Sequence, residues 1–187
     1  IMFDIDKGHV LLHLARAAIA EELGFASGDY PRSDWLEEPG ATFVTLTLHG
    51  QLRGCIGSLE AIRPLIDDVR HNAVASAFHD PRFEPLSKEE FAAVLIEVSL
   101  LGKPEFINFT SEQDALAQLN PGLDGVILEY DNHRATYLPQ VWAQLSDPQV
   151  FINHLKAKAG LPENFWSDEI RVSRYTVQKW REGEQHG

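Results

Sequence analysis

The amino-acid sequence predicts an α+β protein, with a mainly antiparallel sheet flanked by helices. Residues 43–58 and 126–138 each contain two runs of strand-forming residues joined by a two-residue turn, which is the pattern of a β-hairpin. Helical patterns lie before, between and after these hairpins, without the regular strand and helix alternation of a parallel sheet. The predicted order is helix, hairpin, helix, strand, helix, hairpin, helices, strand.

Composition limits the class of protein. A chain of 187 residues with 44% hydrophobic residues suits one domain that buries about 70% of its unfolded surface. The net charge of −12 disfavours nucleic acid and anionic membranes as partners. No apolar run reaches the roughly 18 residues of a membrane span, and the N-terminus lacks a signal-peptide pattern. A single cysteine has no partner for an internal disulfide, so we expect a cytoplasmic protein.

The first helix is predicted over residues 7–23, capped by Asp6 and ended by Gly24. His9 and His13 lie four residues apart on one face, a spacing that can bind zinc. No acidic or cysteine ligand is linked to them by a known pattern. A half-exposed helix surface is therefore the simpler interpretation, and no metal site is predicted.

A loop is predicted over residues 25–40, which are rich in Gly, Ser, Asp and Pro. Three large side chains are expected to dock this loop onto the body of the protein. They are Tyr30, Trp35 and Leu36.

The segment FVTLTLHGQLRGCIGSLE, residues 43–60, has the most distinctive local pattern. Its first half alternates apolar and polar residues, the period of a strand with one buried face. His49-Gly50 suits a turn that needs positive φ, and residues 52–58 return as the partner strand. Gly54 and Gly57 interrupt that strand, where glycine usually marks a bulge or the close approach of a ligand or another backbone.

A second helix is predicted over residues 63–79, with Pro64 as a first helical residue. The segment after it, DPRFEPL, contains two prolines and is expected to be a rigid loop. It carries Asp80 and Arg82, two residues that can hold polar groups. Two interpretations remain open: they bind a ligand, or they pair with each other and cap nearby backbone.

Ser87 and Glu90 form a capping box for a short helix that ends at Ala93. Residues 94–101 then alternate as a strand with one apolar side. Glu97 interrupts the other side, where it either lies on a solvated face or points into a cleft.

The second half of the chain predicts further helices, one hairpin and a last strand. A helix capped by Thr110 or Ser111 is expected to end at Leu119. Asp131-Asn132 tolerates the left-handed conformation that a hairpin turn requires. The remaining expected elements are strands 126–130 and 133–138, helices 139–145 and 147–160, and a strand over 169–179.

One basic and aromatic segment lies near the C-terminus. It contains Arg171, Arg174, Tyr175, Lys179, Trp180 and Arg181. Such segments can hold single-stranded nucleic acid by charge and stacking. In an acidic chain, a charged edge strand is the simpler interpretation.

Cys55 is the leading candidate for a catalytic residue, as a nucleophile. The reactive form is the thiolate, which a nearby cation or base must stabilise. The candidates for that role are Arg53, His49, His71 and His79. The alternative is that Cys55 is a small buried residue on a glycine-rich strand.

An anion is the second predicted ligand of the same region. The stretch from Arg53 to Ser58 offers backbone N–H groups and is soon followed by a helix. The chain lacks both glycine-rich nucleotide motifs, so a nucleotide-binding fold is not predicted. The cations expected to bind the anion are Arg53, Arg82 and Arg134.

LRGCIG, at residues 52–57, resembles the signature of the AMMECR family, and later segments match that family in the same order. They are NAVASAFHDPRFEPL at 72–86, EVSLL at 97–101, LDGVILEYDNHRATYLPQVW at 123–142 and FINHLKAKAG at 151–160. The resemblance therefore covers nearly the whole chain.

The resemblance implies one AMMECR domain over residues 1–187, with a core at about 6–180 and a flexible tail at 181–187. It also implies a larger and a smaller lobe, separated by a cleft near the LRGCIG strand. We expect Cys55 and the binding residues to line this cleft. The binding residues are Arg53, Gly54, Gly57, Asp80, Arg82 and Arg134.

Two hypotheses about function follow. In the first, the protein is an enzyme or ligand-binding protein that takes an anionic substrate in the cleft. Prokaryotic family members resemble part of the AmmeMemoRadiSam set, beside a MEMO-type protein similar to non-haem iron dioxygenases and a radical SAM protein. The association with these two proteins suggests a nucleotide or modified nucleobase as substrate. In the second hypothesis, the protein is a non-catalytic partner of those two proteins. No cofactor is predicted.

Overall fold

The computed structural model describes residues 4–25, 28 and 32–184, with side chains from Lys7 onward. It divides into two compact units, the larger within Ile1–Leu101 and Gln178–Gly187 and the smaller within Gly102–Val177. Each unit contains one four-stranded antiparallel sheet with helices, so the predicted α+β class is confirmed. The cleft expected between two lobes stays a prediction.

The larger unit is built on the sheet β2-β1-β3-β8, in which β2 is an edge strand. Its strands are β1 (Thr42–Leu48), β2 (Gln51–Gly57), β3 (Leu95–Leu101) and β8 (Val177–Arg181). Its helices are α1 (Asp4–Glu22), α2 (Asp34–Glu37), α3 (Leu65–Phe78) and α4 (Lys88–Ala93).

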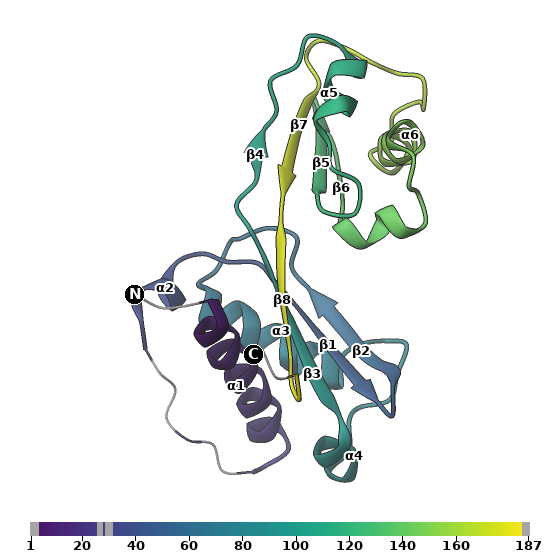
Figure 1. Ribbon diagram of the computed structural model, residues 1–187. Helices are drawn as coiled ribbons and strands as arrows, with labels where there is room; N and C mark the ends of the chain where they lie inside the picture. The colour runs from purple at the N-terminus through teal and green to yellow at the C-terminus, as the bar shows by residue number, and fades with distance from the viewer. Residues whose placement is uncertain (1–3, 26–27, 29–31, 185–187) are drawn as a thin grey trace. The chain divides into compact units, whose positions relative to one another are not determined.

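The core of the larger unit lies between the sheet and the two long helices, α1 and α3, which lie side by side against one sheet face (Figure 1). Alternate strand residues point into this core, including Val44 and Leu46 of β1 and Ile96 and Val98 of β3. Because side chains alternate along a strand, the residues between them point to the other face. That face carries Thr45, Cys55 and Glu97, each of them half-buried.

The predicted hairpin is present as β1 and β2. His49 and Gly50 form its turn with φ of 51° and 79°, as the sequence indicates. The register shifts opposite Leu46 and Thr47, so that Arg53 is an extra residue in β2 between the paired Leu52 and Gly54. This is a β-bulge, and it bends the strand two residues before Cys55.

The smaller unit is built on the sheet β4-β7-β5-β6. Its elements are β4 (Glu105–Phe106), α5 (Glu112–Gln118), β5 (Gly125–Tyr130), β6 (His133–Tyr137), a 3-10 helix (Pro139–Ala143), α6 (Pro148–Lys158) and β7 (Arg171–Tyr175). Helix α6 buries Phe151, whose ring stacks on Trp142 at 3.7 Å between centroids. The hairpin turn predicted at Asp131-Asn132 is present, with a φ of 53° at Asp131.

The prediction of one strand over residues 169–179 is wrong. The chain forms two strands, β7 and β8, on either side of Thr176, and each joins a different sheet. The basic residues predicted as one segment are therefore divided between the two units. Tyr175 and Trp180 are both buried, so neither ring is available to stack on a base, and the nucleic-acid interpretation loses its aromatic component.

Other differences are small. Pro64 caps α3 from outside, with extended ψ, and residues 139–143 form a 3-10 helix in place of an α-helix. Trp35 packs on the core and Leu36 is buried, as predicted, whereas Tyr30 and the side chain of Asp6 lie outside the described residues. A flexible tail was predicted over residues 181–187. Arg181 instead belongs to β8 and Glu182 is bound by Arg16 at 2.7 Å, whereas residues 185–187 lie outside the described residues. No helix among the described residues has the length and apolar character needed to cross a membrane.

Candidate functional site

Cys55 lies in the middle of edge strand β2, with a half-exposed side chain. Its paired residue on β1 is Thr45, whose hydroxyl donates a hydrogen bond to the Cys55 sulfur at 3.3 Å. Exposed N–H and C=O groups on an edge strand need partners other than a neighbouring strand. The chain supplies these partners to Cys55 from the DPRFEPL loop.

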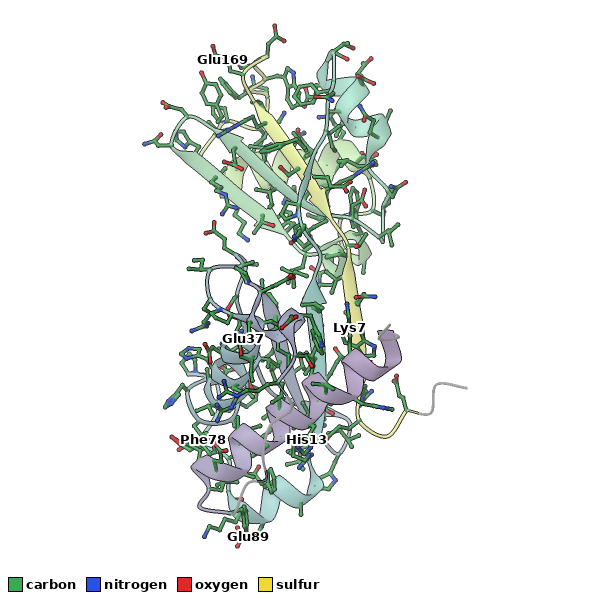
Figure 2. The ribbon with its side chains drawn as sticks, turned by 90° about the vertical axis from the view of Figure 1, so that its left-hand side faces the viewer. Lys7, His13, Glu37, Phe78, Glu89 and Glu169 are labelled. Carbon is green, nitrogen blue, oxygen red and sulfur yellow. The ribbon has the colours of Figure 1, made fainter. Side chains whose placement is uncertain are left out.

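Asp80 is the residue that joins this loop to Cys55. It follows the end of α3, whose last residue, Phe78, is labelled in Figure 2. Asp80 is only 4% exposed, and its carboxylate accepts hydrogen bonds from the backbone N–H of Cys55 at 3.0 Å and of Arg82 at 3.1 Å. Asp80 therefore holds the loop against the open edge of β2.

Arg82 completes the contact. Its Nε and Nη2 donate to the two oxygens of Asp80 at 3.0 and 2.7 Å, and Nη2 also donates to the Cys55 carbonyl at 3.4 Å. The Arg82 hydrogen bond, with smaller help from the Cys55 N–H, keeps the pKa of Asp80 well below its usual range. The pKa of Arg82 is raised, chiefly by the hydrogen bond to Asp80 and less by a charge interaction with Cys55.

The structure shows the second interpretation of the loop, and ligand binding by these residues stays a prediction. Asp80 and Arg82 pair with each other and cap backbone, as one interpretation expected, and they do so beside Cys55. The side chain of Arg82 remains 54% exposed, and its Nη1 makes no hydrogen bond within the described part of the chain. Arg82 is therefore a fixed cation whose Nη1 is an open donor.

Arg53, the other predicted cation, is occupied by the protein itself. Its guanidinium donates to both oxygens of Glu90 at 2.7 and 3.1 Å and to the Glu84 carbonyl at 2.8 Å. Only 11% of the side chain is exposed, and its Nη1 is buried without a partner. Arg53 and Arg82 lie over the ring of Phe83, 5.8 and 5.4 Å from its centroid. Arg53 thus secures the loop.

This ion pair predicts a contribution to acid stability. The hydrogen bond from Arg53 lowers the pKa of Glu90 from 4.5 to about 2. A carboxyl group with a depressed pKa in the folded state stabilises the protein above its unfolded pKa, and this contribution is lost as the pH falls through the folded value. Glu90→Gln should therefore be less stable than the wild type at pH 7, and the difference should shrink between about pH 4.5 and 2. Urea unfolding at several pH values tests this.

Glu89→Gln is the matched control, because Glu89 is an exposed neighbour on α4 (Figure 2). It should leave the pH dependence unchanged. If the free energy of unfolding of Glu90→Gln falls with pH as steeply as that of the wild type, the contribution does not come from Glu90.

The two glycines of LRGCIG serve close packing. A Cβ atom at Gly54 would collide with the carbonyl oxygen of Ser76 on α3, and one at Gly57 would collide with the ring of Phe43. Both spaces that glycine leaves open are filled by the protein's own atoms. Gly54 lets α3 approach β2, and this approach brings Asp80 to Cys55.

A buried polar network closes the other end of the hairpin. Asp68, 1% exposed on α3, accepts hydrogen bonds from the N–H and hydroxyl of Thr42 at 2.7 and 2.8 Å. It also accepts from Ser58 at 2.7 Å and from Arg63 at 2.8 Å. Asn72 adds a hydrogen bond to Asp68 at 3.1 Å. The network ties the start of β1 and the end of β2 to α3.

The remaining candidates lie elsewhere. Arg134 belongs to β6 in the smaller unit, where Glu129 is 3.8 Å from it. His9 and His13 are exposed on α1, and a groove of about 660 Å³ lies between them and residues 181–184 (His13 is labelled in Figure 2). No group of three His, Cys, Asp or Glu side chains suited to a metal ion occurs among the described residues.

Sequence reasoning missed three residues of this region. The sequence pattern marks Thr45 only as part of an alternating strand and Glu90 only as a capping residue, and it does not mark Asp68. Glu90 does form the capping box with Ser87, and the same carboxylate also binds Arg53. Their contacts join residues 10 to 37 positions apart, and no local pattern marks such pairs.

The fold and the site together define a class of protein. It comprises α+β proteins with two antiparallel sheets, in which an LRGCIG edge strand is held by an aspartate and an arginine from the loop after a helix. The AMMECR1 family model matches residues 12–180. The chain therefore belongs to the AMMECR1 family, as its resemblance indicated.

Archaeal proteins resemble the chain over its whole length. It is 34% identical to protein MJ0810 of Methanocaldococcus jannaschii, with 100% of this chain and 95% of that protein covered. It is 38% identical to a protein of Methanothermobacter thermautotrophicus, with 95% of both chains covered. The crystal structure of protein PH0010 from Pyrococcus horikoshii has a TM-score of 0.73 and 34% identity, covering 94% of this chain and 91% of that one.

Proposed function

We propose that the protein binds a small anionic ligand beside Cys55, with Arg82 as the cation that receives it. One observation carries this proposal. The buried Asp80 holds both the backbone N–H of Cys55 and the guanidinium of Arg82, which leaves an exposed, oriented cation next to a half-exposed thiol. A surface arginine without such support would lose side-chain entropy on binding a ligand.

The ligand group that fits is a phosphate or carboxylate. An arginine presents N–H donors in a planar group that matches these groups, and Nη1 of Arg82 makes no hydrogen bond within the described residues. The family resemblance suggests a nucleotide or nucleobase derivative as the ligand. In an enzymatic version, the thiolate of Cys55 is the nucleophile, and Arg82 stabilises it and orients the substrate. A cytoplasmic location belongs to the same proposal, because a reactive free thiol persists best in a reducing compartment.

The test uses Cys55 as its own reporter, because it is the only cysteine of the chain. Alkylation rates are measured with iodoacetate, which is anionic, and with iodoacetamide, which is neutral. Arg82→Gln should lower the ratio of the two rates about three- to tenfold, since a unit charge a few ångströms away is removed. Arg70→Gln is the matched control: it removes the same charge from α3, where Arg70 pairs with Glu21 at 2.8 Å.

Inorganic phosphate and adenosine monophosphate serve as probe ligands in the same assay. Both should slow alkylation by iodoacetamide in the wild type and not in Arg82→Gln. An unchanged rate ratio in Arg82→Gln would overturn the proposal. If phosphate protects the wild-type thiol and Cys55→Ala turns over substrate as fast as the wild type, only the nucleophilic role of Cys55 is removed.

A second candidate function is a non-catalytic partner of a MEMO-type and a radical SAM protein. The observation that favours it is the loop after Ser58, where Leu59 is 45% and Ile62 is 79% exposed. Exposed apolar side chains of this size are common at protein interfaces. Co-purification of the three proteins distinguishes the hypotheses: binding that is lost in the double variant Leu59→Ser, Ile62→Ser favours the partner role. Turnover of a metabolite by this protein alone contradicts it.

A further inference from the structure

Cys55 belongs to a row of side chains that crosses three strands. Thr45 of β1 is paired with Cys55 of β2 on one side and with Glu97 of β3 on the other. Directly opposite residues of neighbouring strands point to the same face, with Cβ atoms about 5 Å apart. The three side chains therefore form a line about 10 Å long on the sheet face opposite α1 and α3.

The two ends of this line differ in charge. Arg82 binds the outer edge of β2, because it contacts the Cys55 carbonyl that faces away from β1. Glu97 lies two strands further into the sheet, half-buried, and its carboxylate makes no hydrogen bond or ion pair within the described part of the chain. Cys55 and Thr45 lie between a fixed cation and a carboxylate without a partner.

Two cations lie on the same sheet face as Glu97, and neither forms an ion pair with it within the described part of the chain. They are Lys179 and Arg181 of the neighbouring strand β8, on either side of Trp180, which points into the core, and Arg181 Nη2 donates to the Thr47 hydroxyl at 3.3 Å. The residues next to Glu97 along β3, Ile96 and Val98, point into the core. A carboxylate in this position attracts a positive or N–H group from a ligand and repels a second anionic group.

We propose that the ligand of this site is dipolar, with an anionic group bound by Arg82 and a cationic or N–H-donating group bound by Glu97, across Cys55 and Thr45. This inference rests on the proposed function and narrows its ligand class. Glu97 disfavours a ligand with anionic groups at both ends. An amino-acid derivative, or a nucleotide whose base presents N–H donors, fits both ends.

The experiment compares three thiol reagents of one chemistry and different charge. They are 2-sulfonatoethyl, 2-(trimethylammonium)ethyl and methyl methanethiosulfonate, which are anionic, cationic and neutral. Each rate with Cys55 is divided by the rate of the neutral reagent. Glu97→Gln should lower the cationic ratio about threefold and leave the anionic ratio equal or higher, whereas Arg82→Gln should lower the anionic ratio. Glu89→Gln, an exposed acid on α4, should change neither ratio.

The outcomes separate the two proposals. An unchanged cationic ratio in Glu97→Gln, with the Arg82 effect present, overturns the dipolar ligand and leaves the anion site intact. An equal fall with all three reagents in Glu97→Gln indicates a change of packing and also counts against Glu97 as a ligand group. An absent Arg82 effect overturns the proposed function itself, whatever Glu97→Gln shows.

Discussion

Gly54→Ala is expected to destabilise the protein by about 3 kcal/mol and to dismantle the site. The added methyl group meets the backbone carbonyl of Ser76, which cannot rotate away as a side chain could. Helix α3 must therefore move away from β2, and Asp80, which follows that helix, moves away from the Cys55 N–H. Urea unfolding measures the first effect. The iodoacetate to iodoacetamide ratio at Cys55 measures the second and should fall toward that of Arg82→Gln.

Gly50→Ala is the control within the same hairpin. Nothing lies within 4 Å of a Cβ atom at Gly50, so its only cost is the positive φ of 79°. That cost is about 1 kcal/mol, and the charge selectivity of Cys55 should be unaffected. If Gly54→Ala were as stable as Gly50→Ala, the close approach of α3 would not be what positions Asp80.

Asp68→Ala is the second substitution with a large expected effect, a loss of about 3 kcal/mol of stability. It removes a carboxylate that accepts hydrogen bonds from Thr42, Ser58, Arg63 and Asn72, and it leaves the buried donors of Thr42 and Asn72 without that partner. The start of β1 and the end of β2 lose their connection to α3. Thermal and urea unfolding, followed by circular dichroism, measure the loss.

Asp67→Ala provides the comparison, because Asp67 is the adjacent residue in the first turn of α3 and is exposed. Its loss removes the same charge from the same helix end, at a cost of about 0.5 kcal/mol. Equal effects of the two substitutions would show that Asp68 acts only through the helix dipole. A much larger effect of Asp68→Ala is the expected result.

The candidate site was predictable in its residues but not in its contacts. Cys55, Asp80 and Arg82 were expected to meet, and they do, through the backbone of Cys55 and the carboxylate of Asp80. Arg53 was expected to face a ligand, but it pairs with Glu90, because the bulge places it beside α4 and the loop. Arg82 is the predicted cation that contacts Cys55, through a hydrogen bond to its carbonyl.

The elements that depend on a few neighbouring residues were determined by the sequence alone. Positive φ at His49-Gly50 and the capping box of Ser87 and Glu90 each follow from the local chemistry of a turn or helix end. Family membership was determined in the same way, because the motif segments match in order.

The tertiary structure decided what depends on distant parts of the chain. It divided the last strand at Thr176 between two sheets, and it filled the spaces at Gly54 and Gly57 with Ser76 and Phe43. It also aligned Cys55 with Glu97 through Thr45. Each of these outcomes arises from contacts between residues that only the folded chain brings together, and alternation or turn chemistry carries no information about such partners.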